Sequence, residues 1–126
     1  MDDEIRAALG HSQVIDMTTT GRRTGEPRRI EIYLHSLEGR LVITGMPVAD
    51  STRAWLHNLE ADPALTLHLK GPFATADLPG TARVVVDPAE RRGLLEGAAR
   101  NWGRTDVDVM VEHSPLVEVT IPGYTA

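Results

Sequence analysis

The sequence predicts a mainly β fold, in which an antiparallel sheet curls into a β-barrel and two to three helices cover its ends. Three observations lead to this fold class. Roughly six segments have the alternating pattern or β-branched content of strands. Short turns link several of these segments, and only two segments carry firm helix signals. A doubly wound parallel sheet would need a helix between successive strands, which this chain does not offer.

Hydrophobic alternation and β-branched content locate the strands. The clearest alternation runs from Arg29 to His35, where Ile30, Ile32 and Leu34 face one way and their neighbours the other. After it, the pair Glu38-Gly39 is typical of a hairpin turn into the next strand. The predicted strands are residues 14–20, 29–35, 41–43, 65–70, 81–86 and 117–121.

The first firm helix is predicted from about Ser51 to about Ala61. Asp50 or Ser51 is the candidate cap, and Pro63 stops the helix. Within it, Trp55 and Leu59 are four residues apart, so one side is apolar.

The second helix is predicted to begin after Asp87, with Pro88 at its first position and Glu90 placed to complete a capping box. Leu94, Leu95 and Ala98 form its inner face, and it should end near residue 100. Residues 1–13 are predicted to form an N-terminal extension or a short helix. The segment 106–112 fits either a helix or a strand.

Length and composition set the class of protein. The 126 residues fit one domain, residues 1–126. There is no cysteine, which excludes disulfides, thiolate metal sites and a cysteine nucleophile. The five histidines show no metal-ligand spacing, so no metal site is expected. A net charge of −5 disfavours nucleic acid. No apolar run approaches the ~20 residues of a membrane span, and the acidic N-terminus is unlike a signal peptide, so a cytoplasmic protein is expected.

Residues 18–29, TTTGRRTGEPRR, are the most informative segment. Gly21 and Gly25 bracket a loop between two predicted strands, and glycine permits a positive φ that lets backbone N–H groups converge on an anion. Thr20 and Thr24 add hydroxyl donors. Planar, permanently charged guanidinium groups add phosphate-binding forks at Arg22, Arg23, Arg28 and Arg29. The segment fits either a phosphate-binding loop or a solvent-exposed basic hairpin turn.

Two blocks of this sequence resemble the deazaflavin-dependent nitroreductase family. The first is TTTGRRTG at residues 18–25, followed by Pro27 and Arg28. The second is WLHNLEADP at residues 55–63, similar to the family helix Trp-Tyr-His-Asn-Leu-x-Ala-Asn-Pro. The blocks stand in the family's order, with a strand, a turn and a strand between them. The resemblance covers residues 14–121.

The resemblance implies a split β-barrel of the FMN-binding, pyridoxamine-phosphate-oxidase-like type. It also implies that the deazaflavin coenzyme F420 lies in a groove, with its phosphate and polyglutamate tail near the basic loop. Trp55 is then either a wall of the coenzyme site or a core residue, and Asn58 either touches the ligand or ties its helix to the loop. The residues implied to bind the coenzyme are Thr20, Gly21, Arg22, Arg23, Thr24, Gly25, Arg28, Thr44, Gly45, Trp55 and Asn58.

Tyr33 falls where a family tyrosine approaches the ring and substrate, so it is the candidate catalytic residue, with an ordinary surface strand residue as the alternative. The chain departs from the family at residues 44–47, which read Thr-Gly-Met-Pro where members often have Ser-x-Gly-Gly. The C-terminal region has Trp102 and only Tyr124 where nitroreductases are rich in tyrosine. Nitroimidazole reduction is therefore not supported.

The resemblance implies an F420-dependent oxidoreductase that transfers a hydride from the reduced deazaflavin to a small organic acceptor, an enone, a quinone or a nitro compound. In such an enzyme the coenzyme carries out the chemistry. The protein binds and orients the coenzyme and the acceptor, and it keeps water out of the site. The alternatives are a split barrel that binds FMN and a non-catalytic module that holds a phosphorylated ligand. A homodimer is the expected assembly, with a monomer as the alternative.

Overall fold

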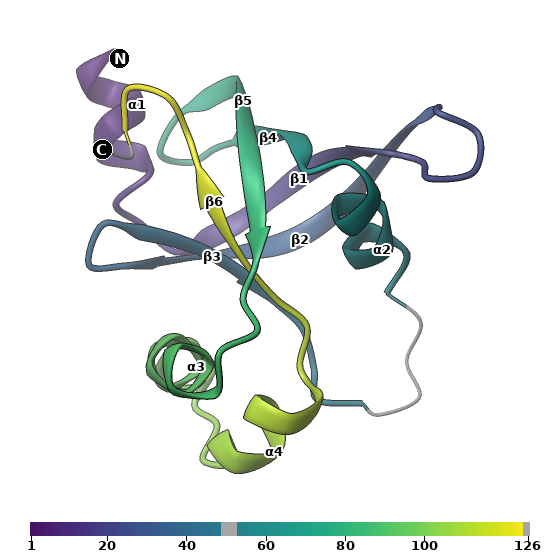
Figure 1. Cartoon of the computed structure of the whole chain (residues 1–126). Coiled ribbons are helices and arrows are strands. Elements are labelled where there is room, and N and C mark those ends of the chain that lie inside the picture. The colour runs from purple at the N-terminus through teal and green to yellow at the C-terminus, as the bar shows by residue number, and fades with distance from the viewer. Residues whose placement is uncertain (49–52, 125–126) are drawn as a thin grey trace.

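The computed structural model describes residues 1–48 and 53–124, which form six strands and four helices. All strand pairs are antiparallel, and the sheet closes on itself in the order β1-β2-β3-β6-β5-β4, with β4 pairing back to β1 (Figure 1). The predicted barrel is confirmed, but the described residues contain four helices where two to three were expected. The elements are α1 (Asp3–Ala8), β1 (Gln13–Thr20), β2 (Pro27–Leu37), β3 (Arg40–Thr44), α2 (Ala54–Ala61), β4 (Ala64–Lys70), β5 (Thr75–Val84), α3 (Pro88–Trp102), α4 (Val107–His113) and β6 (Leu116–Thr120).

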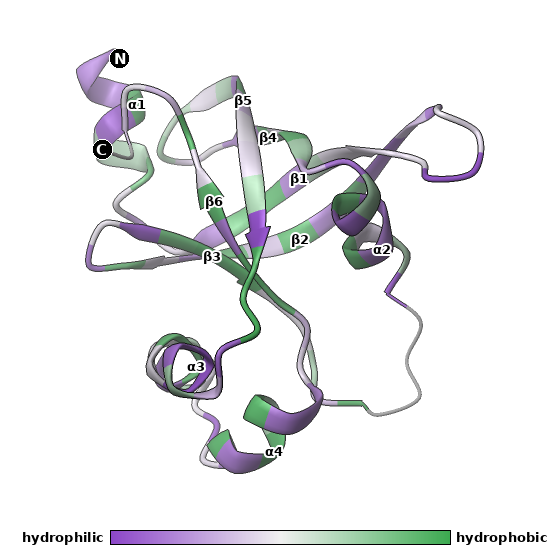
Figure 2. Ribbon diagram, viewed as in Figure 1, coloured by the Kyte–Doolittle hydropathy of each residue, from purple (hydrophilic) through white to green (hydrophobic). Residues whose placement is uncertain are grey.

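The interior of the barrel holds the main hydrophobic core. On β1, Ile15 and Met17 are fully buried, whereas Asp16 and Thr18 between and beyond them reach the outer face. The predicted alternation of β2 is confirmed, because Ile30, Ile32 and Leu34 all join this core. Figure 2 shows the same alternation as green and purple segments along the strands. Most polar and charged strand residues are therefore on the outside of the barrel; Gln13 and Thr19 of β1 are inward exceptions.

A second apolar cluster joins α3 and α4 to the outside of the barrel. It contains residues of β3, β6 and the segment after β5, packed against both helices. Its buried members are Val42, Val85, Leu94, Leu95, Ala99, Met110 and Leu116. The ambiguous segment 106–112 is thus a helix, because its apolar residues cover this cluster. None of the helices that the structure describes is long and apolar enough to cross a membrane.

The turns and caps follow their local chemistry. Glu38 and Gly39 both have positive φ, 50° and 86°, as a tight hairpin turn requires. Asp87 caps α3 by accepting a hydrogen bond from the Glu90 amide at 2.9 Å. The capping box is only half formed, because the Glu90 carboxylate bonds arginines instead. Gly103, with φ 67°, ends α3 at Trp102, slightly later than predicted.

Two element boundaries were predicted wrongly. Helix α2 begins at Ala54, after Arg53, and not near Ser51; the proposed caps Asp50 and Ser51 lie outside the described residues. Strand β5 extends from Thr75, although only 81–86 was predicted, and it ends before Val85. The sequence hides its first half because proline and glycine are rare in strands. At Gly80 a Cβ would lie 2.8 Å from the Thr120 carbonyl, so the barrel needs glycine there.

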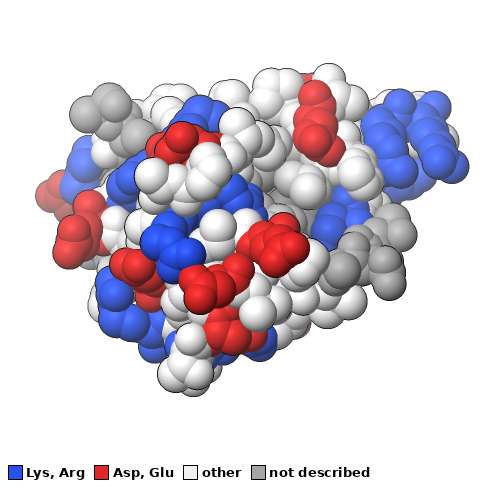
Figure 3. Space-filling view, turned by 60° about the horizontal axis from the view of Figure 1, so that its bottom comes forward, with Lys and Arg blue, Asp and Glu red and all other residues white. Residues whose placement is uncertain are grey.

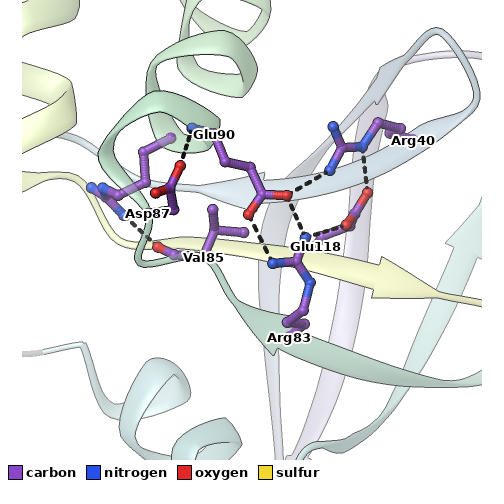
Figure 4. A network of polar contacts seen from close by, with 7 residues as sticks. Arg40, Arg83, Val85, Asp87, Glu90 and Glu118 are labelled. Carbon is purple, nitrogen blue, oxygen red and sulfur yellow. Dashed lines mark hydrogen bonds and ion pairs between the residues drawn. The ribbon is translucent and has the colours of Figure 1, made fainter.

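Four charged side chains tie α3 to the barrel wall (Figure 4). The Arg83 guanidinium of β5 donates to both carboxylate oxygens of Glu90 on α3, at 2.9 and 2.8 Å. It also donates to Glu118 of β6 at 2.7 Å. Arg40 of β3 donates to Glu118 at 2.6 Å and to Glu90 at 3.2 Å. Each carboxylate is shared by two arginines, so the four groups act as one network.

The arginines lower the pKa of both carboxyl groups. Hydrogen bonds from Arg83 hold the pKa of Glu90 at about 2, below its ordinary value of 4.5. The pKa of Glu118 is also lowered, chiefly by the hydrogen bond from Arg40. Because the folded protein binds protons more weakly than the unfolded chain, the network contributes its full stability above about pH 4.5 and loses it as the pH falls toward 2.

We therefore expect the double variant Glu90→Gln/Glu118→Gln to be less stable than the parent protein at neutral pH, and its free energy of unfolding to depend less on pH between 4.5 and 2. Urea unfolding at several pH values measures this. Glu96→Gln, a change on the exposed side of the same helix, is the control. Equal acid sensitivity in the parent and the double variant would contradict the assignment.

Candidate functional site

A pocket of about 320 Å³ lies between the β1–β2 loop and α2. The strands β1 and β2 place their loop at one end of the barrel, and α2 packs beside it (Figure 1). Arginine side chains gather over this projecting loop, seen as blue atoms on the right of Figure 3. The pocket is lined by Thr19, Gly21, Arg22, Arg23, Thr24, Arg28, Arg29, Ile30, Ala54, Trp55 and Asn58.

The loop is held by its own hydrogen bonds. The amide of Gly25 donates to the Gly21 carbonyl, and the amide of Gly21 donates to the Glu26 carbonyl, both at 2.8 Å. The Glu26 amide donates to the Thr24 hydroxyl at 3.2 Å. Gly25 has φ 73°, whereas Gly21 is needed for space, because a Cβ there would lie 3.1 Å from the Glu26 carbonyl. All three amides donate within the protein, so they do not point at the pocket as donors to an anion.

Arginine side chains supply the positive charge of the pocket instead. Arg29 is paired with Asp16 at 3.0 Å. Within the described residues, Arg22, Arg23 and Arg28 form no ion pair with a carboxylate, and all three are exposed. Arg28 donates to the Thr24 hydroxyl at 3.3 Å, which orients its guanidinium along the pocket. Three guanidinium groups without an ion pair thus give this pocket a positive lining, to which an anion would be attracted.

Asn58 joins the loop to α2. Its side chain is 3% exposed. Its carbonyl oxygen accepts hydrogen bonds from the Arg22 amide at 3.1 Å and the Arg22 guanidinium at 3.3 Å, and its amide group donates to the Thr19 hydroxyl at 3.1 Å. Asn58 also lines the pocket, so the structure places it where both expected roles are open to it. Both roles expected of Trp55 are likewise open, because it lines the pocket and also packs against the barrel core.

The remaining residues of the predicted set lie elsewhere. Thr20 and Gly25 border a separate groove on another side of the loop. Thr44 is buried, and its hydroxyl donates to the Pro115 carbonyl. Gly45 lies against Arg53 and Pro115. Conversely, Thr19, Ile30 and Ala54 line the pocket without having been predicted, because an apolar or small residue in a strand or helix gives no chemical signal.

Tyr33 lies on the outer face of β2 in an aromatic cluster. Its ring centroid is 4.8 Å from that of His35 and 6.3 Å from that of Trp102 on α3. His35 is fully buried, and burial lowers its pKa to about 4, so the ring is neutral at neutral pH. The Asn101 amide group lies 3.0 Å from His35 Nδ1. The partly exposed Tyr33 ring thus packs against His35 of its own strand and Trp102 of α3.

A family profile described as F420H(2)-dependent quinone reductase matches residues 3–121. The chain belongs to the F420H(2)-dependent quinone reductase family. It is therefore an F420-dependent oxidoreductase, and its coenzyme is F420. The resemblance inferred from the two sequence blocks is confirmed. A comparison with curated proteins finds no significant match.

Solved structures confirm the split-barrel fold of this F420H(2)-dependent quinone reductase family member. A conserved hypothetical protein from Mycobacterium tuberculosis has a TM-score of 0.75 at 18% identity, covering 97% of this chain and 81% of its own. An F420-H2 dependent reductase has a TM-score of 0.63 at 18% identity, covering 85% and 93%. A Listeria innocua protein provisionally named a pyridoxamine 5′-phosphate oxidase has a TM-score of 0.66 at 14% identity, covering 95% and 92%.

The pocket of this family member fits the anionic groups of F420. The coenzyme has a phosphate and a polyglutamate tail, and guanidinium forks bind phosphate and carboxylate oxygens through paired hydrogen bonds. Arg22, Arg23 and Arg28 supply such forks, while the Trp55 indole supplies a flat apolar wall in the same pocket. A volume of about 320 Å³ is at the lower end for ligand pockets, so the pocket suits one part of the coenzyme.

We expect Asn58→Ala to destabilise the protein by about 1–3 kcal/mol, because it removes the acceptor of the Arg22 amide and the donor to Thr19 in a buried place. Urea unfolding measures the change. His57→Ala, on the exposed side of the same helix, should cost less than about 1 kcal/mol, since its contact to Glu60 is a surface pair. If the two variants are equally stable, Asn58 does not hold the loop.

Proposed function

We propose that this F420-dependent oxidoreductase holds the phosphate region of its coenzyme with Arg22, Arg23 and Arg28 and reduces a small quinone-like acceptor near Tyr33. The observation that carries the proposal is the charge state of the loop. The three guanidinium groups are exposed and without a carboxylate partner among the described residues, beside an indole wall. Such a loop attracts a phosphorylated ligand and gives it one orientation.

The direction of β2 links the loop to the proposed reaction site. Arg29 and Tyr33 are four residues apart on the outer face of this strand, which separates their Cα atoms by about 13 Å. An extended coenzyme anchored by its phosphate at the loop can therefore reach the aromatic cluster of Tyr33 and Trp102. The packing of Tyr33 against His35 and Trp102 limits the positions that its hydroxyl can take.

The chemistry divides between coenzyme and protein. When bound, reduced F420 supplies the hydride. The loop arginines fix the coenzyme, and the aromatic cluster offers an apolar surface against which a flat acceptor can lie. The Tyr33 hydroxyl donates a hydrogen bond to the acceptor oxygen as negative charge develops there. A quinone fits this arrangement because reduction places charge on a carbonyl oxygen.

We expect Arg23→Ala and Arg28→Ala each to weaken F420 binding by about 10- to 100-fold, the loss of a charged hydrogen bond to phosphate. Fluorescence titration of the purified protein with F420, and separately with FMN, measures this. Arg92→Ala, which removes an arginine paired with Asp108 on the helical side of the protein, is the control. Unchanged F420 affinity in both loop variants, or stoichiometric FMN binding without a response to F420, would overturn the proposed site.

We expect Tyr33→Phe to lower kcat for a quinone by about tenfold or more while leaving the F420 dissociation constant unchanged, because only the phenolic hydrogen bond is lost. Stopped-flow oxidation of reduced F420 with quinone, enone and nitro acceptors measures the rates. Tyr124→Phe is the matched control, since the hydroxyl of Tyr124 lies 3.5 Å from the Leu9 carbonyl instead. Equal rates for the two variants would remove Tyr33 from the mechanism.

The expected homodimer and cytoplasmic location stay predictions. Sedimentation of the purified protein with and without F420 would decide the first.

A further inference from the structure

Three polar side chains on the outer face of the barrel form a hydrogen-bonded chain away from the arginine pocket. The Thr18 hydroxyl of β1 lies 2.7 Å from Nε2 of His68 on β4. Nδ1 of His68 lies 2.7 Å from a carboxylate oxygen of Asp77 on β5. His68 is 8% exposed, whereas the Asp77 side chain is 77% exposed. His68 and Asp77 are directly opposite in register, and Thr18 follows diagonally on the next strand.

The contact with Asp77 fixes the role of one ring nitrogen of His68. A carboxylate only accepts hydrogen bonds, so Nδ1 of His68 carries the proton that it donates to Asp77. In the neutral ring Nε2 is then the acceptor, and the Thr18 hydroxyl donates to it. This order of hydroxyl, imidazole and carboxylate is the arrangement that activates a hydroxyl nucleophile in Ser-His-Asp hydrolases.

The Thr18 hydroxyl has room for a reactant beside it. Thr18 borders a groove of about 390 Å³ that crosses β1, β4 and β5 below the β1–β2 loop. Thr66 lies directly opposite Thr18 in the β1–β4 register and borders the same groove, so a second hydroxyl is available next to the first. The described lining residues of this groove carry no charge: Thr18, Thr19, Thr20, Gly25, Pro27, Ala64, Leu65, Thr66, Pro79 and Gly80.

We propose that Thr18, His68 and Asp77 form a nucleophilic triad that accepts the acyl group of a small uncharged ester, giving this oxidoreductase a second, hydrolytic activity. The uncharged groove selects a neutral ester, in contrast to the arginine pocket, which binds an anion. The proposal is independent of where F420 binds and which acceptor it reduces.

The reaction balances without a further reagent. The Thr18 oxygen attacks the ester carbonyl carbon while its proton passes to Nε2 of His68. Thr66 donates a hydrogen bond to the oxygen that becomes negative. The bond from the acyl carbon to the leaving alcohol breaks, and the alcohol takes the proton from His68. Water then attacks the acyl-threonine by the same route, which releases the acid and restores the threonine hydroxyl.

The test uses the whole protein and p-nitrophenyl acetate. We expect p-nitrophenol release above the buffer rate, and transient acetylation of the peptide that contains Thr18, detected by mass spectrometry after acid quench. Thr18→Val keeps the shape of the side chain, and it should abolish both signals. Thr81→Val, on the exposed surface of β5, is the matched control and should leave them unchanged.

Asp77 provides the sharper variant, because its side chain is 77% exposed and its replacement leaves the core intact. Thermal unfolding and F420 binding check that the variants are folded. The Asp77→Asn amide can donate to Nδ1, which favours the tautomer with the proton on Nε2, so release should fall about 100-fold or more. Asp77→Ala removes the carboxylate without supplying a donor, so its rate of p-nitrophenol release should fall less than that of Asp77→Asn. Release that persists in Thr18→Val, acetylation confined to Lys70 or the N-terminal amine, or equal rates in the two Asp77 variants and the parent would overturn the triad.

Discussion

Closure of the six-stranded barrel constrains where every functional side chain of this protein can lie. Because β1 pairs with both β2 and β4, each strand has two neighbours, and its inward residues fill one continuous core. Most polar strand residues consequently point outward, although Gln13 and Thr19 of β1 share the inward positions of Ile15 and Met17 and are buried. Tyr33, Thr18 and Asp77 are all placed on the outer face by this alternation, and the pocket forms only where a loop and α2 extend beyond the barrel end.

The basic loop is distinguished by three arginines close together in the sequence that have no carboxylate partner among the described residues. Arg6, Arg53, Arg91 and Arg100 also form no ion pair there, but they are scattered along the chain. Arg29, Arg40, Arg83, Arg92 and Arg104 also bear positive charge, but each is paired with a carboxylate. In the described structure Arg22, Arg23 and Arg28 have no such partner, so their field is not cancelled locally. A protein of net charge −5 can therefore keep a strongly attractive site for an anion. The same pairing elsewhere strengthens the scaffold, as in the network of Glu90 and Glu118.

Rigidity of the loop comes from short contacts within it and from Asn58. The amides of Gly21, Gly25 and Glu26 are all bonded inside the loop, and Asn58 fixes Arg22 from α2. The pocket is consequently lined by the side-chain donors Arg22, Arg23 and Arg28, whereas a P-loop binds phosphate with its backbone amides. The loop also separates two surfaces of different character, the charged pocket beside Trp55 and the uncharged groove beside Thr18.

The sequence by itself determined the barrel class, five of the six strands nearly to their ends, the Glu38–Gly39 turn and the Asp87 cap, because alternation and capping are local properties. It also located the arginine cluster and, by resemblance, the coenzyme. Tertiary structure alone showed that β5 continues through Pro79 and Gly80. Position 80 requires glycine because the Thr120 carbonyl leaves no room for a Cβ. Tertiary structure alone also showed which arginines are left unpaired, and it brought Thr18, His68 and Asp77 together. The triad contacts join residues up to 59 positions apart in the sequence. Strand pairing across the closed barrel brings them together, and the pattern within a single segment cannot specify that pairing.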